Sequence, residues 1–201
     1  MDRRTLLRSA LVAGLAGGIW TPAAAGRIEC EGDGTPLQFM PRTLPDDEPL
    51  IDELEKYPRC PYCGMDRSKW HHSRHLVHYE DGRVDGTCSL HCTAIALAVN
   101  MDLGPQAIYA ADFGSDADIK PLIDVSEAIY LIGSALPGTM SARSKMAFAD
   151  AAAAELAQSA HGGALEDFDA ALLTAYQDMA QNTVMIRKRR AERRARMQNA
   201  M

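Results

Sequence analysis

Four cysteines in two closely spaced pairs are the residues of this chain best suited to chemistry. Cys60 and Cys63 are separated by two residues, a spacing that folds around a tight turn with both sulfurs directed to one centre. Cys88 and Cys92 are separated by three residues, which suits the first turn of a helix because positions i and i+4 share a face. The positive end of that helix favours thiolate over thiol. The pairs together offer four sulfurs, the number that a tetrahedral soft-metal site requires.

The spacing of the cysteines leaves three interpretations open. The cysteines could bind Zn(II) in a closed structural site, form two disulfides, or hold Cu(I) in an open site that passes the ion on. Two methionines favour Cu(I), because a thioether prefers Cu(I) to Zn(II). Met65 follows Cys63 closely and Met140 lies in a Gly/Pro loop, although either side chain could instead pack in a core. The sequence predicts a Cu(I) site, with Zn(II) as the alternative ion, and the candidate ligands are Cys60, Cys63, Met65, Cys88, Cys92 and Met140.

Five of the six histidines lie around these cysteines, but none is predicted to be a permanent ligand. His75 and His78 fall on opposite faces of a predicted strand, so we expect at most one of them to point inward. His71 and His72 are expected in an exposed loop. His91 points in a different helical direction from the cysteines on either side of it.

The elements that must position the cysteines form a strand–strand–helix unit. Residues 74–79 alternate in the manner of a half-buried strand. Asp81-Gly82 predicts a hairpin turn, and residues 83–88 form the return strand. Ser89 is placed to cap a helix that ends at about Asn100.

A second unit of the same plan is expected downstream. Strands over residues 107–111 and 128–133 precede a helix over about 148–160, where consecutive alanines favour helix. A short strand over residues 164–168 follows, and a long amphipathic helix begins near residues 167–169. The sequence therefore predicts an α+β fold of two strand–strand–helix units plus a long C-terminal helix.

The N-terminus is predicted to be a twin-arginine-type signal peptide. Arg3 and Arg4 precede an apolar run from Ala10 to Trp20, and small residues after the run offer a cut site behind Ala25. The run is too short for an ordinary membrane span, and retention as an anchor is the alternative. These features predict a periplasmic protein. A fifth cysteine, Cys30, lies alone after the cut site.

The charge of the chain is distributed unevenly. Residues 187–201 hold seven Arg or Lys and one Glu, whereas residues 26–186 carry a net charge of −14. The net charge of the whole chain is −6. This basic tail could contact a membrane surface or an acidic partner, and a solvated helix end is the plain alternative. Nucleic acid is not expected as a partner of an exported protein. The expected organisation is a signal peptide (1–25), an N-terminal leader segment (26–56), a metal-binding domain (57–168) and a C-terminal helix with the basic tail (169–201).

The segment Cys60-Pro-Tyr-Cys-Gly-Met65, with the hairpin and helix after it, resembles the nitrous-oxide-reductase accessory protein family, NosL. The similarity continues through Ala110-Ala-Asp-Phe, Ala128-Ile-Tyr-Leu-Ile-Gly-Ser and Leu136-Pro-Gly-Thr-Met140, and it covers about residues 57–168. The Cys-Gly-Met element is its most specific part.

The resemblance implies a periplasmic Cu(I)-binding accessory protein, a metallochaperone that helps to assemble the copper centres of nitrous-oxide reductase. Its partners would be this client copper enzyme or its assembly factors, and no enzyme activity is expected. The resemblance also implies paired strand–strand–helix units related to the organomercurial lyase fold. It assigns sulfur ligation to Cys63, Met65 and Met140.

Two departures from the family leave the ligand set and the client open. The chain lacks the lipobox of many members, and its Cys88-Ser-Leu-His-Cys92 pair is similar to the Cys-x3-Cys of TRASH heavy-metal-binding modules. The alternative functions are a structural four-cysteine zinc site used for partner binding and an organomercurial-lyase-like enzyme. Asp66 and Asp85 are interpreted as turn residues, so no catalytic acid is predicted beside the cysteines.

Overall fold

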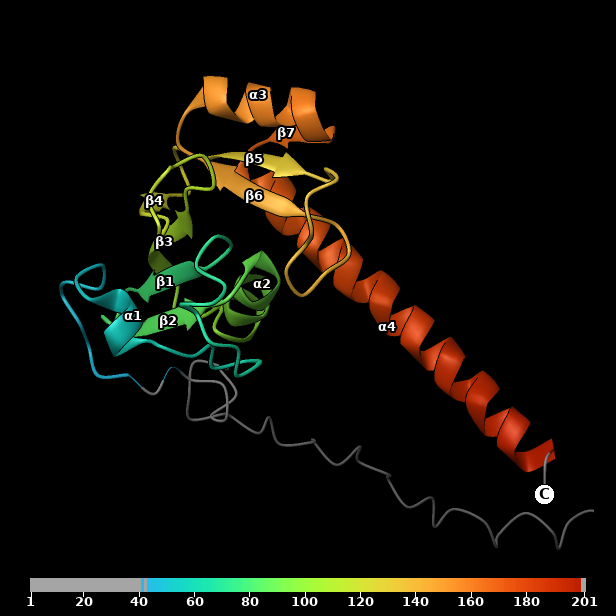
Figure 1. The fold of residues 1–201 in the computed structure, drawn as a ribbon. Coiled ribbons are helices and arrows are strands. Elements are labelled where there is room, and N and C mark those ends of the chain that lie inside the picture. Colours follow the sequence, from blue (N-terminus) through green and yellow to red (C-terminus); the bar gives the residue numbers. More distant parts are fainter. Residues whose placement is uncertain (1–40, 42, 200–201) are drawn as a thin grey trace, which may run out of the picture. The chain divides into compact units, whose positions relative to one another are not determined.

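Two antiparallel sheets form the framework that the helices cover (Figure 1). The computed structural model describes residues 41 and 43–199, so the predicted signal peptide, most of the leader segment and Cys30 lie outside the described residues. The first sheet has the strand order β2-β1-β3-β4 and the second has the order β6-β5-β7. The elements in chain order are α1 (Glu53–Lys56), β1 (His75–Tyr79), β2 (Val84–Thr87), α2 (Leu90–Val99), β3 (Pro105–Ala111), β4 (Leu122–Asp124), β5 (Ile129–Ile132), β6 (Lys145–Phe148), α3 (Ala151–His161), β7 (Ala164–Glu166) and α4 (Phe168–Asn199).

The first sheet is built on the predicted hairpin. β1 and β2 pair in antiparallel fashion, with Val77 opposite Asp85. The turn between them contains Gly82 with a φ of 79°, a left-handed conformation that glycine adopts without steric cost. β2 leads directly to Cys88, and α2 begins two residues later. The strand–turn–strand–helix prediction for this region is confirmed.

The prediction that residues 107–111 belong to the second unit is wrong. β3 pairs with β1, which places Ala110 opposite His75, and β4 pairs with the other edge of β3. The second sheet instead consists of β5, β6 and β7. The choice of partner strand depends on contacts between distant segments, which the local alternation of residues does not encode.

The predicted helix start at Phe148 is also wrong. Phe148 ends β6, a four-residue strand whose residues are all buried, and α3 begins at Ala151. The Asp150 carboxylate accepts a hydrogen bond from the Ala153 N–H at 2.8 Å and thereby caps the helix. An apolar run as short as this one fits either a strand or a helical turn.

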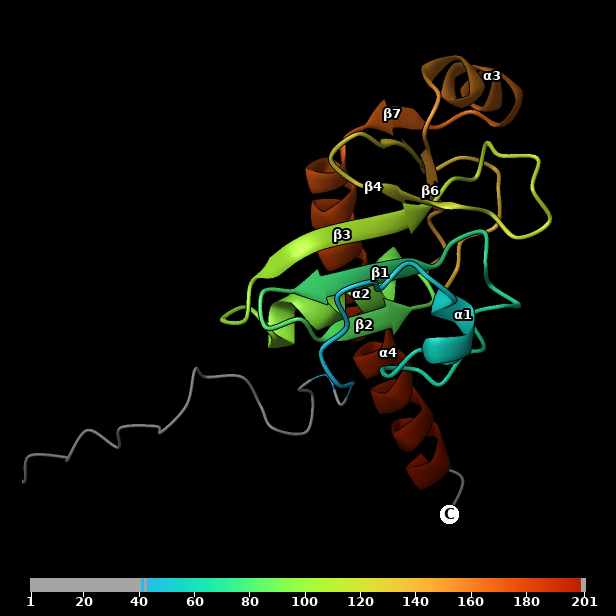
Figure 2. The same cartoon turned by 90° about the vertical axis from the view of Figure 1, so that its left-hand side faces the viewer.

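The bounds of α2 and α4 agree with the prediction. Ser89 precedes α2, although its side chain makes no capping hydrogen bond. The Asp167 carboxylate accepts the Ala170 N–H at 2.9 Å at the start of α4. Figures 1 and 2 show α4 as one continuous helix, and its side chains are exposed from Thr183 onward. Among the described residues, no helix combines the length and the apolar content that crossing a membrane requires.

The main core lies where β1 and β3 meet α2, α4 and the second sheet. Val77 from β1, Ala94 from α2, Tyr130 from β5 and Ala175 from α4 are all buried in it. The Tyr176 hydroxyl donates a hydrogen bond to the Ala94 carbonyl at 2.9 Å, which ties α4 to α2. The helix that carries Cys92 is therefore held between the first sheet and α4.

Both faces of β1 are covered, which corrects the expectation for its histidines. His75 is 2% exposed and His78 is 8% exposed, so both are buried. His75 faces the main core, where its Nε2 lies 3.0 Å from the Tyr130 hydroxyl. On the opposite face, Leu76 packs in a smaller core that includes Tyr57. The alternation of polar and apolar residues in β1 could not show that the chain around residue 57 covers the outer face of this strand.

Candidate metal centre

The structure brings the four paired cysteines together. Their Sγ atoms all lie within 4.8 Å of one another. The Sγ atoms of Cys63 and Cys88 are 3.3 Å apart, and those of Cys88 and Cys92 are 3.7 Å apart. An ion bound to four sulfurs at about 2.3 Å separates neighbouring sulfurs by about 3.8 Å. All four cysteines are free thiols, so the arrangement fits one soft metal ion.

A tight turn supplies the first pair of sulfurs. The Cys60 N–H donates to the Met65 carbonyl and the Gly64 N–H donates to the Cys60 carbonyl, both at 2.9 Å. Gly64 has a φ of 74°, a conformation that costs a glycine nothing and strains other residues. The turn thus closes on itself and directs Cys60 and Cys63 to the same side.

The end of β2 and the start of α2 supply the second pair. Cys88 follows β2 immediately, and Cys92 lies in the first turn of α2. The Ser73 hydroxyl donates to the Cys88 carbonyl at 2.9 Å, and the Thr87 and Thr93 hydroxyls are 2.7 Å apart. These contacts fix the junction of strand and helix, so the hairpin return places this pair beside the turn.

A buried arginine holds the base of the turn against the first sheet. The Arg67 guanidinium is fully buried and donates to the Tyr57 carbonyl at 2.6 Å and to the Thr87 carbonyl at 3.2 Å. It also forms an ion pair with Glu53 at 2.7 Å. A Cβ atom at Gly86 would lie 2.7 Å from the Arg67 Nη1, so the absence of a side chain at Gly86 makes room for the guanidinium.

The three buried thiols influence the ionisation of one another. Hydrogen bonds from Cys88 and Cys92 lower the pKa of Cys60 well below its usual range. Hydrogen bonding to Cys60 in turn raises the pKa of Cys88 and of Cys92. Among these three residues the thiolate is favoured at Cys60, and a bound metal ion would replace the protons of Cys88 and Cys92.

The cluster is open on the side of Cys63. Cys60, Cys88 and Cys92 are each at most 1% exposed, whereas Cys63 is partly exposed. Met65 is partly buried and packs against the cysteines. An incoming ligand would therefore meet the Cys63 sulfur before the others.

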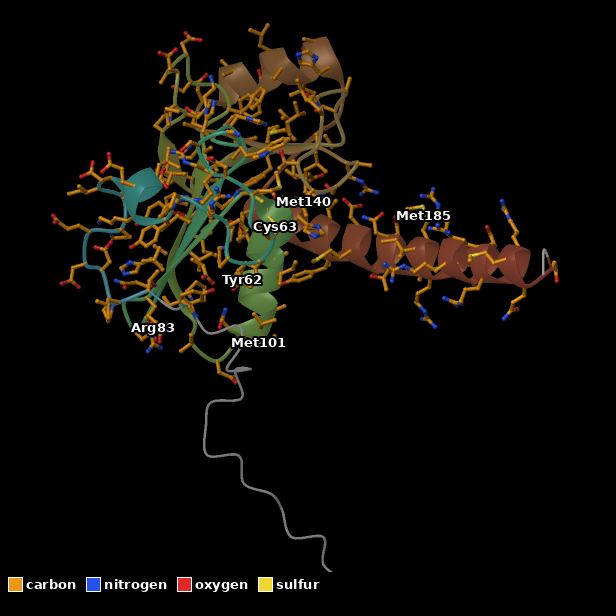
Figure 3. All side chains as sticks on the ribbon, turned by 60° about the horizontal axis from the view of Figure 1, so that its bottom comes forward. Tyr62, Cys63, Arg83, Met101, Met140 and Met185 are labelled. Atoms are coloured by element: carbon orange, nitrogen blue, oxygen red, sulfur yellow. The ribbon has the colours of Figure 1, made fainter. Side chains whose placement is uncertain are left out.

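Met140 lies in a long loop that contacts the start of α2. A small cavity is lined on one side by Ser89 and His91 and on the other by Thr139 and Ser141, which flank Met140. Met140 is 43% exposed and has a φ of 62°, a conformation uncommon for residues other than glycine. Figure 3 shows Met140 and Cys63 towards the same end of α2, opposite to Met101.

The sulfurs converge without a histidine. Among the described residues, the groups placed to hold one metal ion are cysteines alone. His71 and His72 are partly buried rather than exposed as predicted, and the His71 Nδ1 accepts the Lys120 N–H at 3.2 Å. His75 is buried between Ser73 and Tyr130, and this burial lowers its pKa to about 4.

Asp85, predicted to be a turn residue, is a buried strand residue near the cysteines. Asp85 is 3% exposed and lies in β2 rather than in a turn. Its Oδ2 accepts hydrogen bonds from the Tyr62 hydroxyl at 2.6 Å and the Tyr79 hydroxyl at 3.0 Å. Burial raises the pKa of Asp85 to about 6. The sequence shows only that Tyr62 lies between Cys60 and Cys63. It does not show that Tyr62 lies near Asp85, because the distance between the turn and the sheet depends on the fold.

The chain is similar to proteins described as NosL. A protein-family model described as NosL matches residues 51–172. Among solved structures, the copper chaperone NosL from Shewanella denitrificans is 21% identical, with a TM-score of 0.47, over 55% of this chain and 87% of that chain. A comparison with curated proteins gave no match. The family match spans more than half of the chain and includes all four clustered cysteines, and the chain belongs to the NosL family.

Proposed function

We propose that this chain is a periplasmic Cu(I)-binding metallochaperone that delivers copper to a client reductase, with nitrous-oxide reductase as the first candidate. The single observation that carries the proposal is the cluster of four thiols within 4.8 Å, three of them buried and one partly exposed. Membership of the NosL family supports the same function. A soft monovalent ion suits such a set of sulfurs.

The proposed ligands are taken from the cluster and its neighbours. Cys60, Cys88 and Cys92 would hold the ion from the buried side, and Cys63 would hold it at the opening. Met65 packs against these sulfurs and would supply a thioether in place of one or two of the three buried thiolates. Copper would leave by ligand exchange, in which a sulfur or nitrogen of the client replaces one ligand at a time without a change in oxidation state.

Met140 is proposed as a ligand from the second unit. Its loop lies against the first turn of α2, and its side chain is exposed. An exposed thioether beside the opening could take part in capture or release of Cu(I).

A structural zinc site is the second candidate, because four thiolates are the donor set of closed Zn(II) sites. The partial exposure of Cys63 favours the carrier over the closed site. An enzyme is not proposed. The Asp66 carboxylate accepts the backbone N–H of Ser68, and the Asp85 carboxylate is held by two tyrosines.

The location and the domain plan extend this proposal. Export by the twin-arginine-type signal at residues 1–25 would deliver the protein to the periplasm, where its client would be found. Residues 57–168 would form the metal-binding domain, and residues 169–201 would form the C-terminal helix with its basic tail. The tail would contact a membrane surface or an acidic partner.

Anaerobic titration of the mature protein tests the proposal. We expect one Cu(I) per chain, retained against a competing chelator and then transferred to the apo form of nitrous-oxide reductase. Zn(II) should bind without stabilising the fold markedly. Tightly retained Zn(II) that the protein needs in order to fold would instead establish the structural site.

A further inference from the structure

Four polar side chains, three of them buried and one partly buried, form a network beside the cysteines. The Asp85 Oδ2 accepts the Tyr62 and Tyr79 hydroxyls at 2.6 Å and 3.0 Å. The Asn100 Nδ2 donates to the same two hydroxyl oxygens at 3.1 Å and 3.3 Å. We call these four residues the Asp85 network. Among the described residues, no Lys or Arg forms an ion pair with Asp85, so neutral donors alone satisfy its carboxylate.

The Asp85 network joins every element that supplies a clustered sulfur. Tyr62 lies in the turn between Cys60 and Cys63. Asp85 lies in β2, three residues before Cys88. Asn100 ends α2, the helix whose first turn carries Cys92, and its Nδ2 also donates to the Ala96 carbonyl at 3.0 Å.

Tyr62 supplies a side-chain hydrogen bond between the tip of the turn and β2, through its hydroxyl and the Asp85 carboxylate. The backbone hydrogen bonds of Cys60, Gly64 and Met65 fix the internal shape of the turn, but they do not connect it to β2. Arg67 fixes only the base of the turn, through the Tyr57 and Thr87 carbonyls. The tip contains Cys63, whose Sγ lies 3.3 Å from the Cys88 Sγ.

We infer that Tyr62 and Asp85 are positioning residues of the metal site, which hold the Cys63 sulfur over the three buried thiols before the ion arrives. The inference rests on the proposed function. A ligand held in place before binding loses less conformational entropy when the ion binds, and supporting hydrogen bonds of this kind typically change metal affinity by about 10- to 100-fold.

The chain offers a matched control for this inference. The Tyr57 hydroxyl donates to the Asp46 Oδ2 at 2.6 Å, the same type and length of bond as between Tyr62 and Asp85. The other hydrogen-bond partners of the Asp46 carboxylate are Glu48 and Lys56, which are not members of the Asp85 network. Tyr57→Phe therefore removes an equivalent hydrogen bond without touching the tip of the turn.

The experiment compares Tyr62→Phe with Tyr57→Phe in the mature protein. We measure the Cu(I) dissociation constant by chelator competition, the release rate, the number of sulfur neighbours of copper by X-ray absorption, and the melting temperature. Tyr62→Phe should weaken Cu(I) binding by about tenfold, mainly through faster release, and lower the number of sulfur neighbours. Tyr57→Phe should leave all three copper measurements unchanged.

Two substitutions at Asp85 separate positioning from charge. Asp85→Asn keeps an oxygen that accepts the two tyrosine hydroxyls, so we expect it to retain most of the affinity. Asp85→Ala should match Tyr62→Phe. If Tyr62→Phe weakens Cu(I) binding no more than Tyr57→Phe does, the positioning role is refuted while the proposed function stands. If the unaltered protein binds no Cu(I), the proposed function fails and this inference fails with it.

Discussion

The two strand–strand–helix units of this chain differ in how their strands are joined. A short turn around Gly82 joins β1 to β2, whereas residues 133–144 join β5 to β6. The short connection returns the chain so that Cys88 lies beside Cys63. The long connection carries Met140 away from its own sheet to the start of α2. The same local plan thus produces a cluster of four thiols in one unit and an extended loop in the other.

Removal of a sulfur from the first unit should have the largest effect. Cys88 contacts both Cys63 and Cys92, so Cys88→Ala should weaken Cu(I) binding by more than about 100-fold, beyond the range seen for supporting residues. The control is Met146→Leu, which removes a buried sulfur from β6 at nearly constant volume. Equal Cu(I) affinity in both variants would show that the first unit does not build the site.

Acid should weaken the junction between the two units. Burial lowers the pKa of His75 to about 4, so stability that is present above the unfolded pKa of about 6.5 is lost as the pH falls towards 4. This loss amounts to about 3 kcal/mol. His75→Leu should flatten the dependence of the unfolding free energy on pH in this window, as measured by urea denaturation. Identical slopes in the variant and the unaltered protein would exclude His75 as the cause.

The loop that carries Met140 should contribute less to Cu(I) affinity than the turn that carries Cys60 and Cys63. Met140→Ala should weaken Cu(I) binding by about tenfold, or 1.4 kcal/mol, if its thioether adds one weak ligand. Met101 is a suitable control because it is also an exposed methionine and lies at the other end of α2 (Figure 3). If Met140→Ala resembles Met101→Ala in Cu(I) affinity and in transfer to the client, Met140 is not a copper ligand and its loop has only a packing role.

The basic tail should contribute least to stability. Every described side chain of α4 beyond Thr183 is exposed, so deletion of residues 187–201 should change the unfolding free energy by less than about 0.5 kcal/mol. Maturation of the client should fall on deletion at low salt and less at high salt, because salt screens exposed charges. If deletion leaves maturation of the client unchanged at both salt concentrations, the basic tail has no docking role.

The sequence predicted the parts of the fold and site that depend on near neighbours. The Asp81-Gly82 turn determines the hairpin, and the spacing within each cysteine pair brings its two sulfurs together. The pairing of β3 with β1 and the contact of Tyr62 with Asp85 join residues far apart in the sequence. Such contacts depend on which surfaces pack together in three dimensions, so the pattern along one segment could not reveal them.

The close fit between Arg67 and Gly86 has an evolutionary consequence. Any side chain at position 86 would collide with the guanidinium, and a shorter residue at position 67 would leave four buried carbonyl oxygens without their shared donor. A substitution at either position alone would therefore destabilise the fold. Once the arginine at position 67 is lost, position 86 could accept a larger residue. Positions 67 and 86 should therefore covary across relatives of this chain. A relative that keeps the arginine without the glycine, or the glycine without the arginine, would need different contacts to hold the cysteine turn against the sheet.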